Sequence, residues 1–219
     1  MTTAGLIAKK IGMTRMVTPE GQMTAVTLLQ ITPQKVTKIL TADRDGYTGY
    51  QIGYFEKREK RLAKPDISRL RKVSVENNFT RFKEFRAEAL PAGYDLGAPL
   101  AVSAFEGIPS VDVTGITKGR GFTGTPVRWN TAVGRMTHGS RHHRRPGSLG
   151  MRATPGRVFK NRPNPGHYGD EQVTIQNLKI LDIDTVNSVI AVQGAVPGHR
   201  DGYLCVYPSL KIKAPKAKK

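Results

Sequence analysis

Short runs of apolar and β-branched residues, separated by turn-forming residues, occupy both ends of the chain. Val, Ile, Leu, Thr and Tyr fill these runs, and Gly, Pro and Asp bound them, as is typical of short strands. The predicted strands are residues 5–8, 24–31, 36–41, 50–54, 100–105, 111–114, 172–184, 189–193 and 203–207. Many short strands joined by turns favour a mainly β fold with a closed barrel over a β-α-β sheet.

Helical spacing is found in one segment. Ile67, Leu70 and Val73 recur at three-residue intervals, and Asp66 precedes them where an N-cap is expected. The pattern predicts a short helix from Asp66 to Val73 inside a basic insertion at residues 55–80. One or two short helices are expected in the whole chain.

Both periodicities disappear between residues 113 and 169. These 57 residues contain no Asp or Glu, and they hold eleven of the 35 Lys and Arg, four of the five His, eleven Gly and five Pro. Their charge of +11 compares with +7 for the other 162 residues. Because this segment cannot build a core, we expect a barrel body from 1–112 and 170–210, an extended finger from 113–169 and a lysine-rich tail from 211–219.

Composition narrows the class of protein further. The net charge of +18 and the pI near 10.3 indicate a polyanionic partner. The single cysteine excludes a disulfide framework and a zinc site of several thiolates. No uninterrupted apolar run reaches about 18 residues, and the N-terminus becomes charged before a signal peptide could form. We therefore expect a cytoplasmic protein without a membrane partner.

A glycine motif raises the possibility of a dinucleotide site. Residues 119–124 read GRGFTG and match the pattern GxGxxG after a predicted strand. Pro126 follows where a helix should begin, and no acid appears before Asp170 to bind a ribose hydroxyl. The sequence therefore favours a glycine-rich backbone that passes close to phosphates, and no cofactor is expected.

The histidines raise the possibility of a metal site. His138, His142 and His143 lie close together in the sequence, but the neighbouring arginines repel cations and no carboxylate is near. Imidazoles in such a segment are more suited to stacking on bases or bonding to phosphate, unless they are simply solvated. We expect no metal.

Nucleophilic catalysis also lacks support. Ser140 and Ser148 have neither a local acid nor a nucleophile elbow, and Cys205 alternates with apolar neighbours as a buried small residue would. The sequence thus predicts no catalytic residue, no small-molecule substrate and a protein that is not an enzyme.

The finger's arginines favour RNA. Its nine Arg against two Lys suit bidentate phosphate pairing and stacking on bases, and no helix typical of DNA reading is apparent. The candidate RNA-binding residues are Lys118, Arg120, Arg128, Trp129, Arg135, His138, Arg141, His142, His143, Arg144, Arg145, Arg152, Arg157, Lys160 and Arg162. Alternatives are an enzyme that acts on RNA, a DNA-compacting or chaperone protein, and a solvated charged loop.

Seven strings along the chain resemble one known family, the third protein of the large ribosomal subunit in its bacterial type. They are GLIAKKIGMTR at 5–15, VDVTGITKGRGFTG at 111–124, THGS at 137–140, PGRVFK at 155–160, GHYG at 166–169, VTIQNL at 173–178 and GAVPG at 194–198. They occur in order over nearly the whole chain.

The resemblance implies a barrel like that of translation factors and a loop that threads through 23S rRNA toward the peptidyl transferase centre. It implies binding near the 3′ end of that rRNA, an early role in assembly, and contacts with neighbouring large-subunit proteins. By family position, the loop tip comprises Gly150, Met151, Arg152, Ala153 and Thr154.

Two departures from the family pattern stand out. Met151 occupies the place of a glutamine that some relatives methylate, so that modification should be absent. Residues 161–167 read NRPNPGH where relatives often have GKKMAGH. This difference leaves one basic residue in place of two, and its prolines stiffen the return limb.

Overall fold

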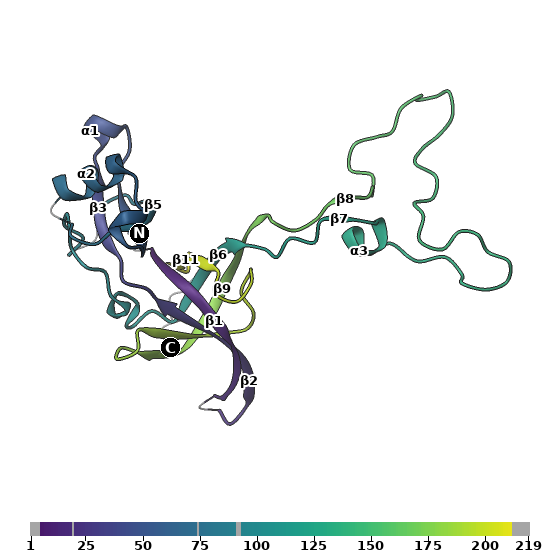
Figure 1. Ribbon diagram of the computed structural model, residues 1–219. Helices are drawn as coiled ribbons and strands as arrows, with labels where there is room; N and C mark the ends of the chain where they lie inside the picture. The colour runs from purple at the N-terminus through teal and green to yellow at the C-terminus, as the bar shows by residue number, and fades with distance from the viewer. Residues whose placement is uncertain (1–4, 19, 74, 91–92, 212–219) are drawn as a thin grey trace, which may run out of the picture. The chain divides into compact units, whose positions relative to one another are not determined.

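The structure is a computed structural model that describes residues 5–18, 20–73, 75–90 and 93–211. The chain divides into two compact units. The first comprises the described residues of Met1–Gly115 and Val173–Lys219, and the second is Ile116–Gln172. Strands predominate (Figure 1), which confirms the predicted mainly β class.

Six strands of the first unit close into a barrel in the order β1-β11-β6-β9-β10-β2. Their bounds are β1 Leu6–Val17, β2 Met23–Ile31, β6 Ser110–Ile116, β9 Gln172–Asp184, β10 Val189–Gln193 and β11 Tyr203–Pro208. The ladders that join β11, β1, β2, β10 and β9 are antiparallel. Leu6, Leu29, Val113, Ile190 and Val206 of these strands are fully buried.

A second sheet of the same unit has the order β3-β4-β5, with β3 at Lys35–Leu40, β4 at Gly49–Glu56 and β5 at Phe79–Arg86. Tyr50 of β4 stacks on Phe85 of β5 with ring centroids 5.5 Å apart. The Tyr50 hydroxyl accepts a hydrogen bond from the Gly5 N–H at 2.7 Å and donates to the Gly5 carbonyl at 3.1 Å. This residue therefore joins the second sheet to the start of β1.

The predicted helix is present as α2, Lys64–Lys72, but the predicted cap is wrong. The helix begins two residues earlier, with Ala63 at the N-cap and no side-chain capping bond. Pro65 explains the difference, since its fixed φ suits the first helical turn. Asp66 instead approaches Arg69 at 3.6 Å.

The expectation of one or two short helices was also too low. The described residues hold three short α-helices, α1 Ala42–Asp45, α2 and α3 Thr125–Trp129, together with 3₁₀ turns at Glu59–Arg61 and Val102–Phe105. None of these helices has the length and apolar content needed to cross a bilayer.

The prediction of a strand at residues 100–105 is wrong. Val102–Phe105 is a 3₁₀ turn in which the Ala104 N–H donates to the Ala101 carbonyl at 3.3 Å. Its buried residues, Val102 and Phe105, are three positions apart, which suits a 3₁₀ turn with three residues per turn.

Two strand features went unpredicted. The strand β5 has Phe at every third position between charged residues, so its pattern fits neither period, and it pairs with β4 alone. The strand β1 runs on to Val17, beyond the predicted 5–8. Of the predicted tail at 211–219, all but Lys211 lies outside the described residues.

Candidate nucleic-acid interface

The second unit has almost no interior. Within residues 116–172, all of which the structure describes, only Thr125 and Gly169 are buried. Two short strands, β7 at Phe122–Thr123 and β8 at Gly166–His167, pair antiparallel near the ends of the unit. The Arg120 N–H donates to the Tyr168 carbonyl at 2.8 Å, and the Tyr168 N–H donates to the Gly121 carbonyl at 2.9 Å. Backbone hydrogen bonds therefore hold the two limbs together here in place of a core.

A second tie between the limbs involves α3 and Asn164 (Figure 1 shows α3 beside β7 and β8). The Asn164 carbonyl accepts one hydrogen bond from Arg128 Nη1 at 3.1 Å and another from Trp129 Nε1 at 2.9 Å. A Cβ at Gly166 would meet the Arg128 guanidinium, so a larger residue there would require that guanidinium to shift. Arg128 and Trp129 thus have structural contacts, and their predicted RNA contacts stay a prediction.

The helix α3 corrects one expectation. It starts directly after residues 119–124, although Pro126 was expected to prevent a helix there. Proline is compatible with the first turn of a helix, where its missing N–H would have no partner in any case. The helix has only five residues, and the acid needed for a dinucleotide site is still lacking before Asp170.

The histidine segment is held by backbone contacts. His143 Nδ1 lies 3.0 Å from the Arg135 carbonyl oxygen, and the Gly134 N–H donates to the His143 carbonyl at 2.8 Å. A Cβ at Gly134 would overlap the carbonyl of His142. In the described part of the chain, no three His, Cys, Asp or Glu side chains gather into a possible metal site.

Most predicted RNA-binding side chains are exposed to solvent. Arg128 and His143 are half-buried. The exposed ones are Lys118, Arg120, Trp129, Arg135, His138, Arg141, His142, Arg144, Arg145, Arg152, Arg157, Lys160 and Arg162. At the predicted tip, Gly150, Met151, Arg152, Ala153 and Thr154 are all exposed, and Met151 reaches 79%.

Within the described part of the chain, ion pairs leave the positive side chains of the second unit unpaired. Among the described residues, ion pairs join Lys9 to Asp201, Lys38 and Arg44 to Asp45, Arg69 to Asp66, and Arg71 to Glu59. All of these residues belong to the first unit. None of the eleven Lys and Arg of residues 116–172 forms an ion pair with another described residue, so a polyanion can approach them without displacing a described carboxylate.

Three arginines of this unit lie over aromatic rings. The distances from Cζ to the ring centroid are 5.1 Å for Arg120 over Tyr168, 5.2 Å for Arg128 over Trp129 and 5.4 Å for Arg157 over Phe159. Such contacts orient the guanidinium plane and leave N–H groups at its edge for phosphate or base oxygens.

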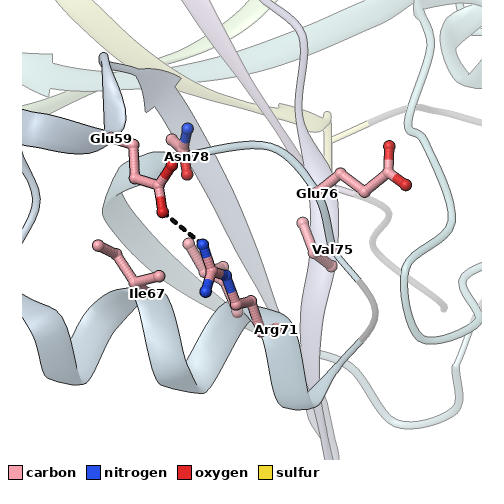
Figure 2. Close-up of a pocket in the computed structure, with 7 residues that line it drawn as sticks. Glu59, Ile67, Arg71, Val75, Glu76 and Asn78 are labelled. Carbon is pink, nitrogen blue, oxygen red and sulfur yellow. Dashed lines mark hydrogen bonds and ion pairs between the residues drawn. The ribbon is translucent and has the colours of Figure 1, made fainter.

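The first unit contains a cavity whose lining includes two acids. It has a volume of about 360 Å³ and is lined by Glu59, Ile67, Leu70, Arg71, Val75, Glu76 and Asn78. Figure 2 shows Glu59 and Arg71 paired across it, while the Glu76 carboxylate points away from that pair. Arg71 therefore neutralises Glu59, one of the two acids in the lining.

Cys205 does not supply a reactive thiol either. It is half-buried and packs against the barrel core. Burial raises the pKa of the thiol, so little of it is thiolate near neutral pH. This is consistent with its predicted role as a small hydrophobic residue.

Sequence reasoning missed the residues that shape the interface. Asn164 and Gly134 shape the limbs but carry no charge and no family string, while Gly166 begins the string GHYG without a predicted role. The one available signal was the position of Asn164 between two prolines, which favours an extended backbone.

A barrel unit joined to an exposed, unneutralised basic unit is typical of the class of structural nucleic-acid-associated proteins. The family model described as Ribosomal protein L3 matches residues 98–189. The Large ribosomal subunit protein uL3 of Burkholderia lata is 43% identical over 218 residues, which is 99% of this chain and all of that protein. The uL3 proteins of Cellvibrio japonicus and Methylobacillus flagellatus are each 42% identical over 212 residues, covering 96% of this chain and 98% and 99% of theirs.

The chain therefore belongs to the uL3 family of ribosomal proteins. Members of this family are structural components of the ribosome and are not enzymes, which confirms the prediction of a non-enzymatic protein.

Proposed function

We propose that this protein is a cytoplasmic constituent of the large ribosomal subunit whose second unit binds 23S rRNA near its 3′ end. There it helps to start subunit assembly, contacts neighbouring large-subunit proteins, and extends residues 150–154 toward the peptidyl transferase centre. The observation that carries the proposal is the set of eleven basic side chains in residues 116–172, none of which pairs with an acid among the described residues.

The mechanism is electrostatic and steric. Arginines fixed over aromatic rings face phosphates and bases, while the exposed backbone of the limbs fits narrow spaces in folded RNA. The finger neutralises charge inside a crowded RNA, which the barrel alone would not reach.

A titration of the full chain against a 3′-domain fragment of 23S rRNA at several salt concentrations tests this function. The slope of log affinity against log salt is negative, and each lost phosphate contact lowers its magnitude by about 0.7–0.9. Changing Arg135 and Arg157 to Gln together should therefore lower the slope by about 1.4–1.8. The matched control changes Lys38 and Arg44, which pair with Asp45 in the first unit, and should leave the slope unchanged.

Equal affinity for duplex DNA and for folded rRNA would contradict the proposal and support a general chaperone. Chemical footprints on assembled subunits provide the second readout. The rRNA around the finger should become less reactive when the protein is present, and equal reactivity with and without it would overturn the assignment.

A further inference from the structure

A small pocket lies within the second unit. Its volume is about 230 Å³, and its polar lining comprises His142, Arg145, Arg162, Thr125, Thr131 and Ser148. These residues come from three stretches of chain, the α3 region, residues 142–149 and the return limb at 162–163. The fold therefore brings together Arg145 and Arg162, which the sequence places 17 residues apart.

The charge of the pocket selects an anion. Arg145 and Arg162 line it, no carboxylate does, and neither arginine has an ion pair in the described structure. An arginine binds phosphate through two parallel N–H bonds, so two arginines at one small pocket suit a single phosphate group.

The volume of the pocket suits one part of a longer ligand. Sites for complete drug-sized ligands begin at about 300 Å³, above the volume found here. Pro146, Leu149 and Pro163 add an apolar wall on which a sugar or base can pack. A lining with both charged and apolar residues matches one nucleotide of a polynucleotide.

The hydroxyl groups favour RNA over DNA. Thr125, Thr131 and Ser148 line the pocket, and Ser148 Oγ donates its proton to the Gly150 carbonyl at 3.0 Å. Ser148 Oγ keeps its lone pairs and can accept a hydrogen bond from a ribose 2′-hydroxyl, a group that DNA lacks.

The walls are fixed before any ligand binds. Gly134 has no room for a Cβ against His142, and its N–H bonds to the carbonyl of His143. The two hydrogen bonds to the Asn164 carbonyl hold the chain two residues after Arg162. A preformed pocket avoids part of the ordering cost of binding.

We propose that this pocket holds a single nucleotide of rRNA, with its phosphate between Arg145 and Arg162 and its ribose against the hydroxyl groups. The inference rests on the proposed function and adds a specific subsite to it.

Hydroxyl-radical footprinting at single-nucleotide resolution on reconstituted large subunits tests the subsite. The pocket variant carries Arg145→Gln and Arg162→Gln, and the control carries Arg58→Gln and Arg61→Gln, which remove the same charge from exposed residues of the first unit, outside the lining. At saturating protein, the pocket variant should lose protection at least fivefold at one or two nucleotides, and the control should keep it.

A third variant fills the pocket without changing its charge. Ala132 belongs to the lining, so Ala132→Phe should expose the same nucleotides as the arginine variant. Identical footprints for all variants and wild type would overturn the pocket alone. Absence of rRNA protection by the wild-type chain would instead overturn the proposed function.

Discussion

The indole Nε1 of Trp129 lies 2.9 Å from the carbonyl oxygen of Asn164, to which it donates a hydrogen bond across 35 positions of the sequence. Arg128 Nη1 reaches the same oxygen at 3.1 Å. One carbonyl therefore joins the outgoing limb of the second unit to its return limb, where no hydrophobic core could do so.

Replacing Trp129 with Phe tests this tie, since it keeps a ring and removes the N–H donor. The loss of one hydrogen bond is worth roughly 0.5–1.5 kcal/mol, so the limbs should separate more often. Amide hydrogen exchange at Arg120 and Tyr168, which pair across the limbs, should speed up about two- to tenfold. The control is Phe159→Leu, because the Phe159 ring has no N–H to donate, and unchanged exchange in the Trp129 variant would contradict the role.

A second prediction concerns Gly49, at the start of β4. A Cβ built there would lie 2.5 Å from the Phe85 carbonyl oxygen and 3.4 Å from the Arg86 Cα. Because these are backbone atoms, the strands must shift, and Gly49→Ala should lower the free energy of unfolding by about 1–3 kcal/mol in urea titrations. Gly12→Ala, with nothing within 4 Å of its Cβ, is the matched control and should change it by less than about 1 kcal/mol.

The backbone of Phe55 leads to a third prediction. Phe55 has a φ of 62°, a left-handed conformation that costs a side chain about 1–2 kcal/mol. Phe55→Gly and Phe55→Ala both remove the ring, so the difference in stability between these two variants isolates the backbone. The glycine variant should be the more stable by about 1 kcal/mol. At Gln51, which has no positive φ, the Ala variant should instead be more stable than the Gly variant. If the Gly variant were the more stable, or the Ala variant the more stable, at both sites, the backbone of Phe55 would not be strained.

Tyr94 and Tyr50 form a contrasting pair of buried tyrosines. The Tyr94 hydroxyl is buried and has no hydrogen-bond partner among the described residues, whereas the Tyr50 hydroxyl makes two bonds with Gly5. Tyr94→Phe should therefore raise the free energy of unfolding by about 1 kcal/mol, and Tyr50→Phe should lower it by about 1–3 kcal/mol. Urea titrations at neutral pH decide this, and a loss of stability in both variants would show that Tyr94 has a partner.

Buried tyrosines also predict the response to alkaline pH. Burial raises the pKa of Tyr94 and of Tyr207 to about 12, whereas an unfolded tyrosine titrates near 10. As pH rises, the unfolded chain loses these protons first, so stability is retained below about pH 10 and falls between about 10 and 12. Thermal unfolding followed by circular dichroism across this range checks the prediction. Tyr207→Phe should flatten the fall, and an equally steep fall would exclude a contribution from Tyr207.

For the fold, the pattern of short apolar runs was sufficient to predict class and most strands, and β9 at Gln172–Asp184 and β10 at Val189–Gln193 match their predicted bounds. The pattern works because a strand with one buried face must alternate in sequence. It failed at β5, where Phe79 and Phe82 pack with Leu70 of α2 and Phe85 joins the main core, and at residues 100–105, where a 3₁₀ turn replaces the two-residue period.

For the candidate site, the sequence by itself determined the charge: residues 113–169 lack acids, so no folding could neutralise their arginines locally. Only the tertiary structure decided which of these side chains converge. Arg145 and Arg162 meet at one pocket because Asn164 and Gly134 fix the limbs, and such contacts depend on backbone positions that no local pattern records.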